Sequence, residues 1–205
     1  MKVLVVTGGI GSGKSYVCRI LEEKYGIPVY EADIRAKRLY NEYPGMLDSI
    51  EETLGVILRN DDGVFAPHLL ADVIFNDAEA LKKVEDILFP VLMNDFNAWA
   101  EKQGTQTVAM ESATLLEKSQ FDGFGDITVL VDAPVDVRLA RAMSRDGASK
   151  EKIMARMQAQ SLMNALSNGA TTAKVDHVLL NDSSEADLEV KLDDFIEKYA
   201  LTKML

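Results

Sequence analysis

Short apolar runs alternate along the chain with segments in which apolar residues recur every three or four positions. The first run, residues 2–7, is β-branched and almost continuously apolar, which is typical of a strand covered on both faces in a parallel sheet. Residues 16–25 show helical spacing, and the Gly-Ile-Pro sequence at 26–28 ends that helix. The chain is therefore predicted to open with a central strand, a glycine-rich loop and a helix.

The same alternation continues through four more apolar runs. A short strand is predicted at residues 29–31, followed by a helix at 34–40 for which Asp33 is a candidate N-cap. Further strands are predicted at 107–110, 127–131 and 178–180. Five strands separated by helices predict an α/β fold with a five-stranded, parallel, doubly wound sheet flanked by helices.

Two segments depart from this alternation and divide the chain. Residues 45–103 contain a turn at 61–63 and a long amphipathic run at 81–99, which together predict a helical insertion. After the fourth strand, residues 135–144 and 149–163 are predicted to form two helices joined around Gly147. The division assigns 1–43, 104–140 and 174–205 to the core, 44–103 to the insertion, and 141–173 to a small helical region.

Composition and charge exclude several classes of protein. The 205 residues carry a net charge of −11 with a pI near 4.7, so a nucleic acid would be repelled. The apolar runs are too short for a signal segment or a membrane span, so we expect a cytoplasmic protein that does not bind membranes. Cys18 is the one cysteine, and His68 and His177 lack the spacing of a zinc site. No chemical role is expected for these three residues.

Residues 8–15 carry the clearest functional pattern, because Gly-Gly-Ile-Gly-Ser-Gly-Lys-Ser matches the phosphate-binding loop G-x-x-x-x-G-K-S/T between a predicted strand and a predicted helix. Its glycines let N–H groups face phosphate oxygens, Lys14 reaches the β- and γ-phosphates of ATP, and Ser15 binds Mg²⁺. The residues expected to bind the nucleotide are Gly9, Gly11, Ser12, Gly13, Lys14, Ser15 and Tyr16. A GTPase is excluded because the chain lacks the guanine-binding sequence N-K-x-D.

Asp33 is the candidate general base. It follows the carboxyl end of the second predicted strand, which in an open α/β sheet faces the same crevice as the phosphate-binding loop. A carboxylate there can accept or orient the proton of an acceptor hydroxyl during in-line phosphoryl transfer. A simple N-cap for the next helix explains Asp33 equally well, and the two roles are compatible.

Arginines beyond the fourth strand are candidates for contact with the nucleotide. Arg138, Arg141 and Arg145 are three and four residues apart and so share one helix face, while Arg156 lies on the following helix. A solvated surface is the alternative. In a P-loop protein we interpret them as a lid that clamps the transferring phosphate, and we favour Arg141 and Arg145.

A second acidic residue is expected to steady Mg²⁺ at the end of an apolar strand. Asp132 follows the cleaner apolar run, Val129-Leu130-Val131, whereas Glu111 ends the strand that is expected to lie next to the first one. The sequence does not decide between the two.

With these residues in place, the chain resembles the dephospho-coenzyme A kinase family over nearly its full length. The resemblance begins with residues 7–15 and continues at Glu31-Ala32-Asp33, where the family carries Asp-Ala-Asp. The other matching positions, in the family's order and spacing, are Asp62-Gly63, 70–75, Leu115-Leu116-Glu117, Phe121-Asp122, Arg141 and Arg145-Asp146-Gly147, Arg156 and Gln160, and 176–181.

The resemblance implies a P-loop core, a helical insertion that holds the coenzyme A precursor, and a small lid at 141–173. It implies a phosphotransferase that moves the γ-phosphate of ATP to the ribose 3′-hydroxyl of dephospho-CoA, giving CoA and ADP. In that reaction Asp33 would be the base and Arg141 the lid arginine. Lys14, Asp33 and Arg141 are then the expected catalytic residues, and Arg145 joins the expected nucleotide-binding residues.

Four positions depart from the family's pattern. Glu31 replaces an aspartate, Pro67 an arginine, Phe89-Pro90 a His-Pro pair, and Ala113-Thr114 a Pro-Leu pair. All but Glu31 lie in regions expected to meet the acceptor. Two alternatives therefore stay open: another small-metabolite or nucleoside monophosphate kinase, and a nucleotide-binding module without transfer activity.

Overall fold

The computed structural model of the protein describes residues 1–75, 77–118, 121–160 and 174–202. They form two compact units. The sheet unit combines Met1–Glu31 with Gln103–Leu205, and the helical unit comprises Ala32–Lys102. Residues 161–173, the C-terminal part of the lid predicted at 141–173, lie outside the described residues.

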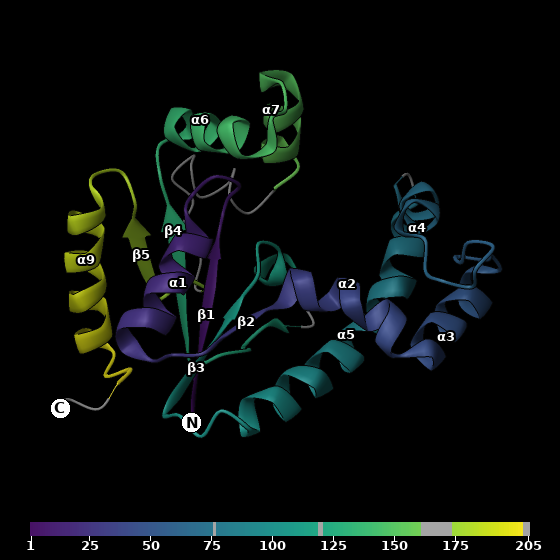
Figure 1. Ribbon diagram of the computed structural model, residues 1–205, viewed down its shortest axis with the longest axis horizontal. Helices are drawn as coiled ribbons and strands as arrows, with labels where there is room; N and C mark the ends of the chain where they lie inside the picture. Colours follow the sequence, from purple (N-terminus) through teal and green to yellow (C-terminus); the bar gives the residue numbers. More distant parts are fainter. Residues whose placement is uncertain (76, 119–120, 161–173, 203–205) are drawn as a thin grey trace. The chain divides into compact units, whose positions relative to one another are not determined.

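A five-stranded parallel sheet forms the centre of the sheet unit (Figure 1), as the sequence predicts. The strand order is β2-β3-β1-β4-β5, so the strand that precedes the P-loop lies in the middle. Leu4, Val5 and Val6 are fully buried in it, which explains the continuous apolar run of a strand covered on both faces. The strands are β1 (Lys2–Gly8), β2 (Val29–Glu31), β3 (Thr107–Glu111), β4 (Ile127–Asp132) and β5 (His177–Leu180).

Two helices, α1 (Lys14–Tyr25) and α9 (Glu185–Lys198), bury their apolar sides against the sheet. Leu21 of α1 and Phe195 of α9 belong to one apolar cluster with Leu4 of β1. A capping box fixes the start of α9, because the Ser184 hydroxyl accepts a hydrogen bond from the Asp187 N–H and the Asp187 carboxylate accepts one from the Ser184 N–H. No element is predicted for this segment from the sequence, so α9 is an addition.

Cys18 lies in the same cluster, on the buried side of α1. Burial raises the pKa of its thiol, and the nearby Glu111 carboxylate acts in the same direction. The thiol is therefore enclosed and protonated.

Two further helices, α6 (Val135–Asp146) and α7 (Lys150–Gln158), follow β4 and lie beyond the carboxyl ends of β1 and β4 (Figure 1). Gly147 ends α6 in a left-handed conformation, with φ of 61°. Ala142, Ile153 and Met157 form a small apolar cluster that joins the two helices. Residues 161–163 of the helix predicted at 149–163 lie outside the described residues. Elsewhere in the sheet unit, a 3₁₀ turn, η1 (Leu115–Glu117), follows β3.

The helical unit consists of α2 (Ala32–Glu42), α3 (Pro44–Leu54), α4 (Pro67–Ile74) and α5 (Ala78–Glu101). α5 packs against the other three helices. A bidentate ion pair joins α2 to α5, with Arg35 Nε and Nη2 donating to the Asp95 carboxylate at 2.6 and 2.7 Å. Among the described residues, every helix is either too short or too polar to cross a membrane.

The structure corrects the predicted start of α2. The helix begins at Ala32, directly after β2, so Asp33 lies in its first turn and is not the residue before it. A negative charge in the first turn still interacts favourably with the N–H groups of the helix.

Phe195 provides a test of the added helix. Its ring is 1% exposed and lies 4.9 Å from the His177 ring and 5.1 Å from the Tyr199 ring, measured between centroids. We expect Phe195→Ala to lower the free energy of unfolding by about 3–5 kcal/mol, because it leaves a cavity in the core. Val190 of the same helix is 60% exposed, so Val190→Ala should change it by less than about 0.5 kcal/mol. Urea unfolding followed by circular dichroism compares the two, and equal losses would contradict the packing of α9.

Candidate active site

The P-loop, residues 8–15, turns sharply between the end of β1 and the start of α1. Its backbone closes on itself, since the Ser12 N–H donates to Gly9 O at 3.1 Å. Gly11 and Gly13 adopt left-handed φ angles of 77° and 99°, which residues with a Cβ rarely adopt. Because Gly13 precedes α1 and has no side chain with which to cap it, the first turn of α1 offers its N–H groups to an anion.

Lys14 folds back over this loop. Its Nζ donates to Gly8 O at 2.9 Å and lies 3.7 Å from Glu111 Oε1. Glu111 ends β3, and the pairing of Glu111 with Val6 of β1 brings its carboxylate to the edge of the sheet where the P-loop begins. The ammonium group is therefore already at the loop, between a carbonyl and a carboxylate, before a phosphate binds.

Asp132, the other acid that the sequence singles out, lies beside Arg138. Its Oδ1 is buried 3.6 Å from a guanidinium nitrogen of Arg138 and has no hydrogen-bond donor among the described residues. Burial lowers the pKa of the Arg138 guanidinium, and the Asp132 carboxylate opposes that shift. The two candidate acids thus have different surroundings, because Glu111 meets Lys14 whereas Asp132 meets a buried arginine.

Asn181 links the loop to the end of β5. Its Nδ2 donates to Ser12 O at 2.9 Å, while Arg141 donates to Asn181 O at 3.2 Å and to Asn181 Oδ1 at 3.4 Å. A Cβ on Gly13 would clash with the Asn181 amide, which is a second reason for glycine there. Sequence reasoning gave Asn181 no role, although its position after a strand that ends at the P-loop edge was a usable signal.

The three arginines that the sequence places on one face of α6 differ in their exposure. Arg138 is 3% exposed, whereas the side chain of Arg145 is 60% exposed. Arg141 lies between them and reaches the P-loop through Asn181. Arg145 and Arg156 both donate to Asp146, at 2.6 and 2.7 Å, and together they lower the pKa of that carboxyl to about 2, with Arg145 contributing most.

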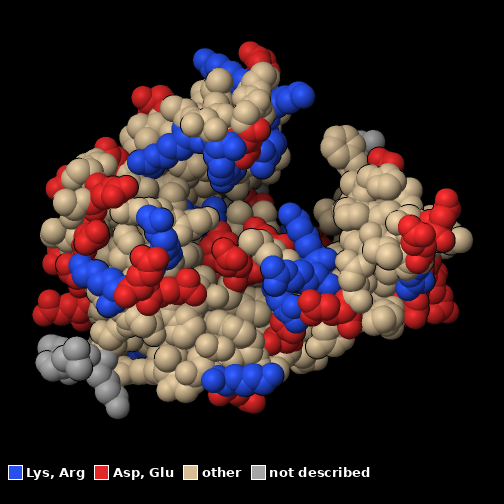
Figure 2. Space-filling model, viewed as in Figure 1, with Lys and Arg blue, Asp and Glu red and all other residues tan. Residues whose placement is uncertain are grey.

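Basic side chains gather over α6 and α7 (Figure 2). Residues 135–158 contain six Lys and Arg residues and three Asp and Glu residues, in a protein whose net charge is −11. A local positive potential next to the P-loop attracts a small polyanion even though the whole molecule repels extended ones. This reconciles an acidic protein with a phosphate-binding loop.

The remaining predicted residues lie in two places. Ser15 and Tyr16 occupy the first turn of α1, where Ser15 is exposed and the Tyr16 ring lies 4.9 Å from the Arg19 guanidinium. Asp33 belongs to the helical unit, where it is exposed in the first turn of α2. Its role as the base remains a prediction.

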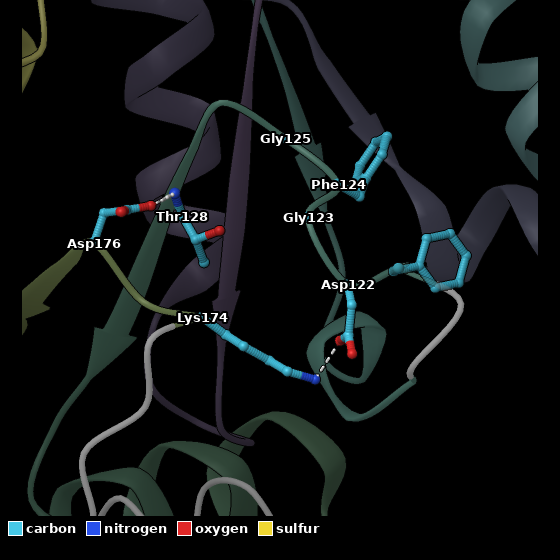
Figure 3. Close-up of a pocket in the computed structure, with 8 residues that line it drawn as sticks. Asp122, Gly123, Phe124, Gly125, Thr128, Lys174 and Asp176 are labelled. Atoms are coloured by element: carbon cyan, nitrogen blue, oxygen red, sulfur yellow. Dashed lines mark hydrogen bonds and ion pairs between the residues drawn. The ribbon is translucent and has the colours of Figure 1, made fainter.

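A cavity of about 240 Å³ opens in the sheet unit beside the first half of β4 (Figure 3). It is lined by residues 121–125, Thr128, Lys174 and Asp176. The Asp176 carboxylate accepts a hydrogen bond from the Thr128 N–H at 2.7 Å, and Lys174 pairs with Asp122 at 2.5 Å. None of the predicted site residues lines this cavity.

Comparison with known proteins decides which P-loop family this arrangement represents. The sequence model of the family described as dephospho-CoA kinase matches residues 2–187. The chain belongs to the dephospho-CoA kinase family. Dephospho-CoA kinases of Porphyromonas gingivalis and Salinibacter ruber are 38% and 37% identical, over 88% and 93% of this chain and 86% and 94% of theirs. A solved protein of Thermus thermophilus is 30% identical with a TM-score of 0.79, covering 96% of this chain and 97% of that one.

Membership of this family confirms the resemblance based on the P-loop and the later motifs. It makes the protein a phosphotransferase, and a kinase family implies ATP as the phosphoryl donor. The prediction of an α/β fold with a five-stranded parallel sheet is likewise confirmed.

Asn181 offers a test of the site that does not depend on the acceptor. Asn181→Ala removes the donor to Ser12 O and the partner of Arg141, so we expect the affinity for ADP to fall about tenfold. Asp182 is the neighbouring exposed residue, paired with Lys191 at 3.0 Å on the surface. Asp182→Ala should leave the affinity nearly unchanged, because exposed ion pairs contribute little. Calorimetric titration with ADP measures both, and an unchanged affinity in Asn181→Ala would argue against the link to the loop.

Proposed function

We propose that the protein phosphorylates the ribose 3′-hydroxyl of dephospho-CoA with ATP, releasing CoA and ADP. The observation that carries this proposal is the match of the dephospho-CoA kinase family across residues 2–187, which includes the whole P-loop and both helices with the candidate arginines. In the reaction the γ-phosphorus forms a bond to the 3′-oxygen as its bond to the β-phosphate oxygen breaks.

Each group around the P-loop has a part in this reaction. Lys14 and the N–H groups at the start of α1 bind the phosphates and stabilise the charge that moves to the leaving oxygen. Arg141, held beside the loop by Asn181, is suited to stabilise charge on the transferring group. Arg145, which pairs with Asp146, is placed at the outer end of α6 and is suited to a more peripheral contact with the nucleotide.

The residues present also fit a Mg²⁺ ion. Ser15 offers an exposed hydroxyl at the start of α1, and Glu111 offers a carboxylate beside Lys14; oxygen donors of this kind suit the ion. Asp132 fits less well, because Arg138 places a positive charge next to it. We therefore favour Glu111 as the acid that steadies the ion. When bound, Mg²⁺ neutralises the β- and γ-phosphate oxygens.

Asp33 is proposed as the base that accepts the 3′-hydroxyl proton, since a carboxylate in the family's second motif is suited to orient that hydroxyl.

Lys14→Ala should abolish transfer and weaken ADP binding more than tenfold. Asp33→Asn should also abolish transfer but leave the ADP affinity within about twofold, because Asp33 is expected to contact the acceptor and not the nucleotide. Parallel turnover and ADP titrations of the two variants separate these roles. Equal loss of ADP affinity in both would count against Asp33 as the base.

The acceptor itself is tested by incubating the purified protein with Mg-ATP, with and without dephospho-CoA. We expect ADP release that depends on the acceptor, and an acceptor mass increased by one phosphate group. Transfer to a different alcohol would keep the kinase and change its substrate. Binding of ADP without transfer to dephospho-CoA or to a panel of nucleoside monophosphates would favour a nucleotide-binding module.

A further inference from the structure

Ile10 lies in the first half of the P-loop, and both of its backbone polar groups are bound by side chains of the α6–α7 segment. The Ile10 N–H donates to Gln160 Oε1 at 2.8 Å, and the Arg138 Nε donates to Ile10 O at 3.1 Å. Gln160 follows the end of α7 and is 6% exposed, while Arg138 belongs to α6 and is 3% exposed. Two buried side chains, one from α6 and one from the residue pair that follows α7, therefore hold a single residue of the loop.

The side chain of Ile10 adds a third contact with the same segment. It packs against the apolar cluster formed by Ala142, Ile153 and Met157, which joins α6 to α7. The hydrogen bonds fix the orientation of the Ile10 backbone, and the apolar contact holds the Ile10 side chain against the cluster. The loop is thus attached to the α6–α7 segment through all parts of one residue.

Arg138 also occupies the space that two glycines leave beside it. A Cβ on Gly9 would clash with the Arg138 guanidinium, and a Cβ on Gly11 would clash with the Arg138 carbonyl group. The first half of the loop therefore lies directly against one arginine. Asp132 Oδ1 lies 3.6 Å from a nitrogen of that guanidinium, which keeps a buried charge close to a counter-charge.

A purely structural role for these contacts would stabilise the fold without affecting the ligand. Their position argues for more, because they act on the loop that binds phosphate and not on the core beneath it. Ordering a residue of a flexible loop costs about 1–2 kcal/mol of conformational entropy. A loop whose conformation is fixed before the nucleotide arrives avoids that cost on binding, so its affinity for the nucleotide is higher.

We propose that Arg138 and Gln160 are positioning residues that hold the P-loop, through Ile10, in its nucleotide-binding conformation before ATP binds. On this view the α6–α7 segment supports the loop from the start, in addition to supplying Arg141. The inference rests on the proposed use of ATP but is independent of the acceptor.

Gln160→Met tests this role with little change in side-chain volume, because it removes the acceptor of the Ile10 N–H. We expect the dissociation constant for ADP to rise about fivefold to tenfold, as for the loss of one buried hydrogen bond. In the full reaction the KM for ATP should rise by a similar factor, while the KM for the acceptor stays the same. Hydrogen exchange of residues 8–15 in the nucleotide-free protein should become faster.

Two matched variants complete the test. Gln158→Met makes the same substitution at an exposed position of α7, and we expect it to bind ADP like the unaltered protein. Arg138→Met should weaken ADP binding further than Gln160→Met, because it removes a charged donor to Ile10 O, the guanidinium that lies against Gly9, and the counter-charge of Asp132. If Arg138→Met fails to fold, Gln160→Met decides alone.

The outcomes separate this inference from the proposed function. An ADP affinity and a P-loop exchange rate that are unchanged in Gln160→Met would overturn the positioning role while leaving the kinase intact. Equal increases in the KM for ATP and for the acceptor would overturn it too, since a general structural defect has that effect. An unaltered protein that binds no ADP would instead contradict the use of ATP itself.

Discussion

A P-loop can turn its N–H groups toward a phosphate only if its carbonyl groups point elsewhere and find donors there. In this protein three alternate carbonyls of the loop are each bound by a different side chain: Gly8 O by Lys14, Ile10 O by Arg138, and Ser12 O by Asn181. These side chains come from the helix after the loop, from α6 and from the end of β5. This arrangement requires the parallel sheet, because the sheet brings the elements that carry these three side chains to one edge.

The sequence was sufficient to predict the sheet because its strands are short apolar runs, the first four of which end in glycine or an acidic residue. A parallel sheet buried on both faces requires such apolar runs. The sequence also located the P-loop, whose glycines are needed by the backbone geometry itself. Helix α9 was missed although its segment carries a local signal, because Ser184 and Asp187 form a capping box and Leu188, Leu192 and Phe195 recur at helical spacing. What no local pattern gives is the place of this helix, which is set by packing on residues far away in the chain.

The site was only partly predictable, for a physical reason that Arg138 and Asn181 illustrate. Helical spacing places Arg138, Arg141 and Arg145 on one side of a helix but does not say what covers that side. The P-loop covers Arg138, whereas Arg145 stays near solvent. Asn181 meets Ser12 across 169 positions of sequence. Its place after a strand indicates the edge of the sheet on which it lies, but no local pattern indicates which residue it contacts there.

The position of Cys18 has a consequence for an enzyme of this family. Coenzyme A ends in a thiol, and its oxidised forms exchange disulfides with exposed protein thiolates. Cys18 is the one cysteine of the chain, and it is buried in the core with a raised pKa. Since exchange requires an accessible thiolate that attacks a disulfide, the folded enzyme presents no thiolate that could attack the disulfide form of the coenzyme. The folded protein is therefore protected against forming a mixed disulfide with coenzyme A, and a shift of the coenzyme pool toward its disulfide forms leaves it unmodified.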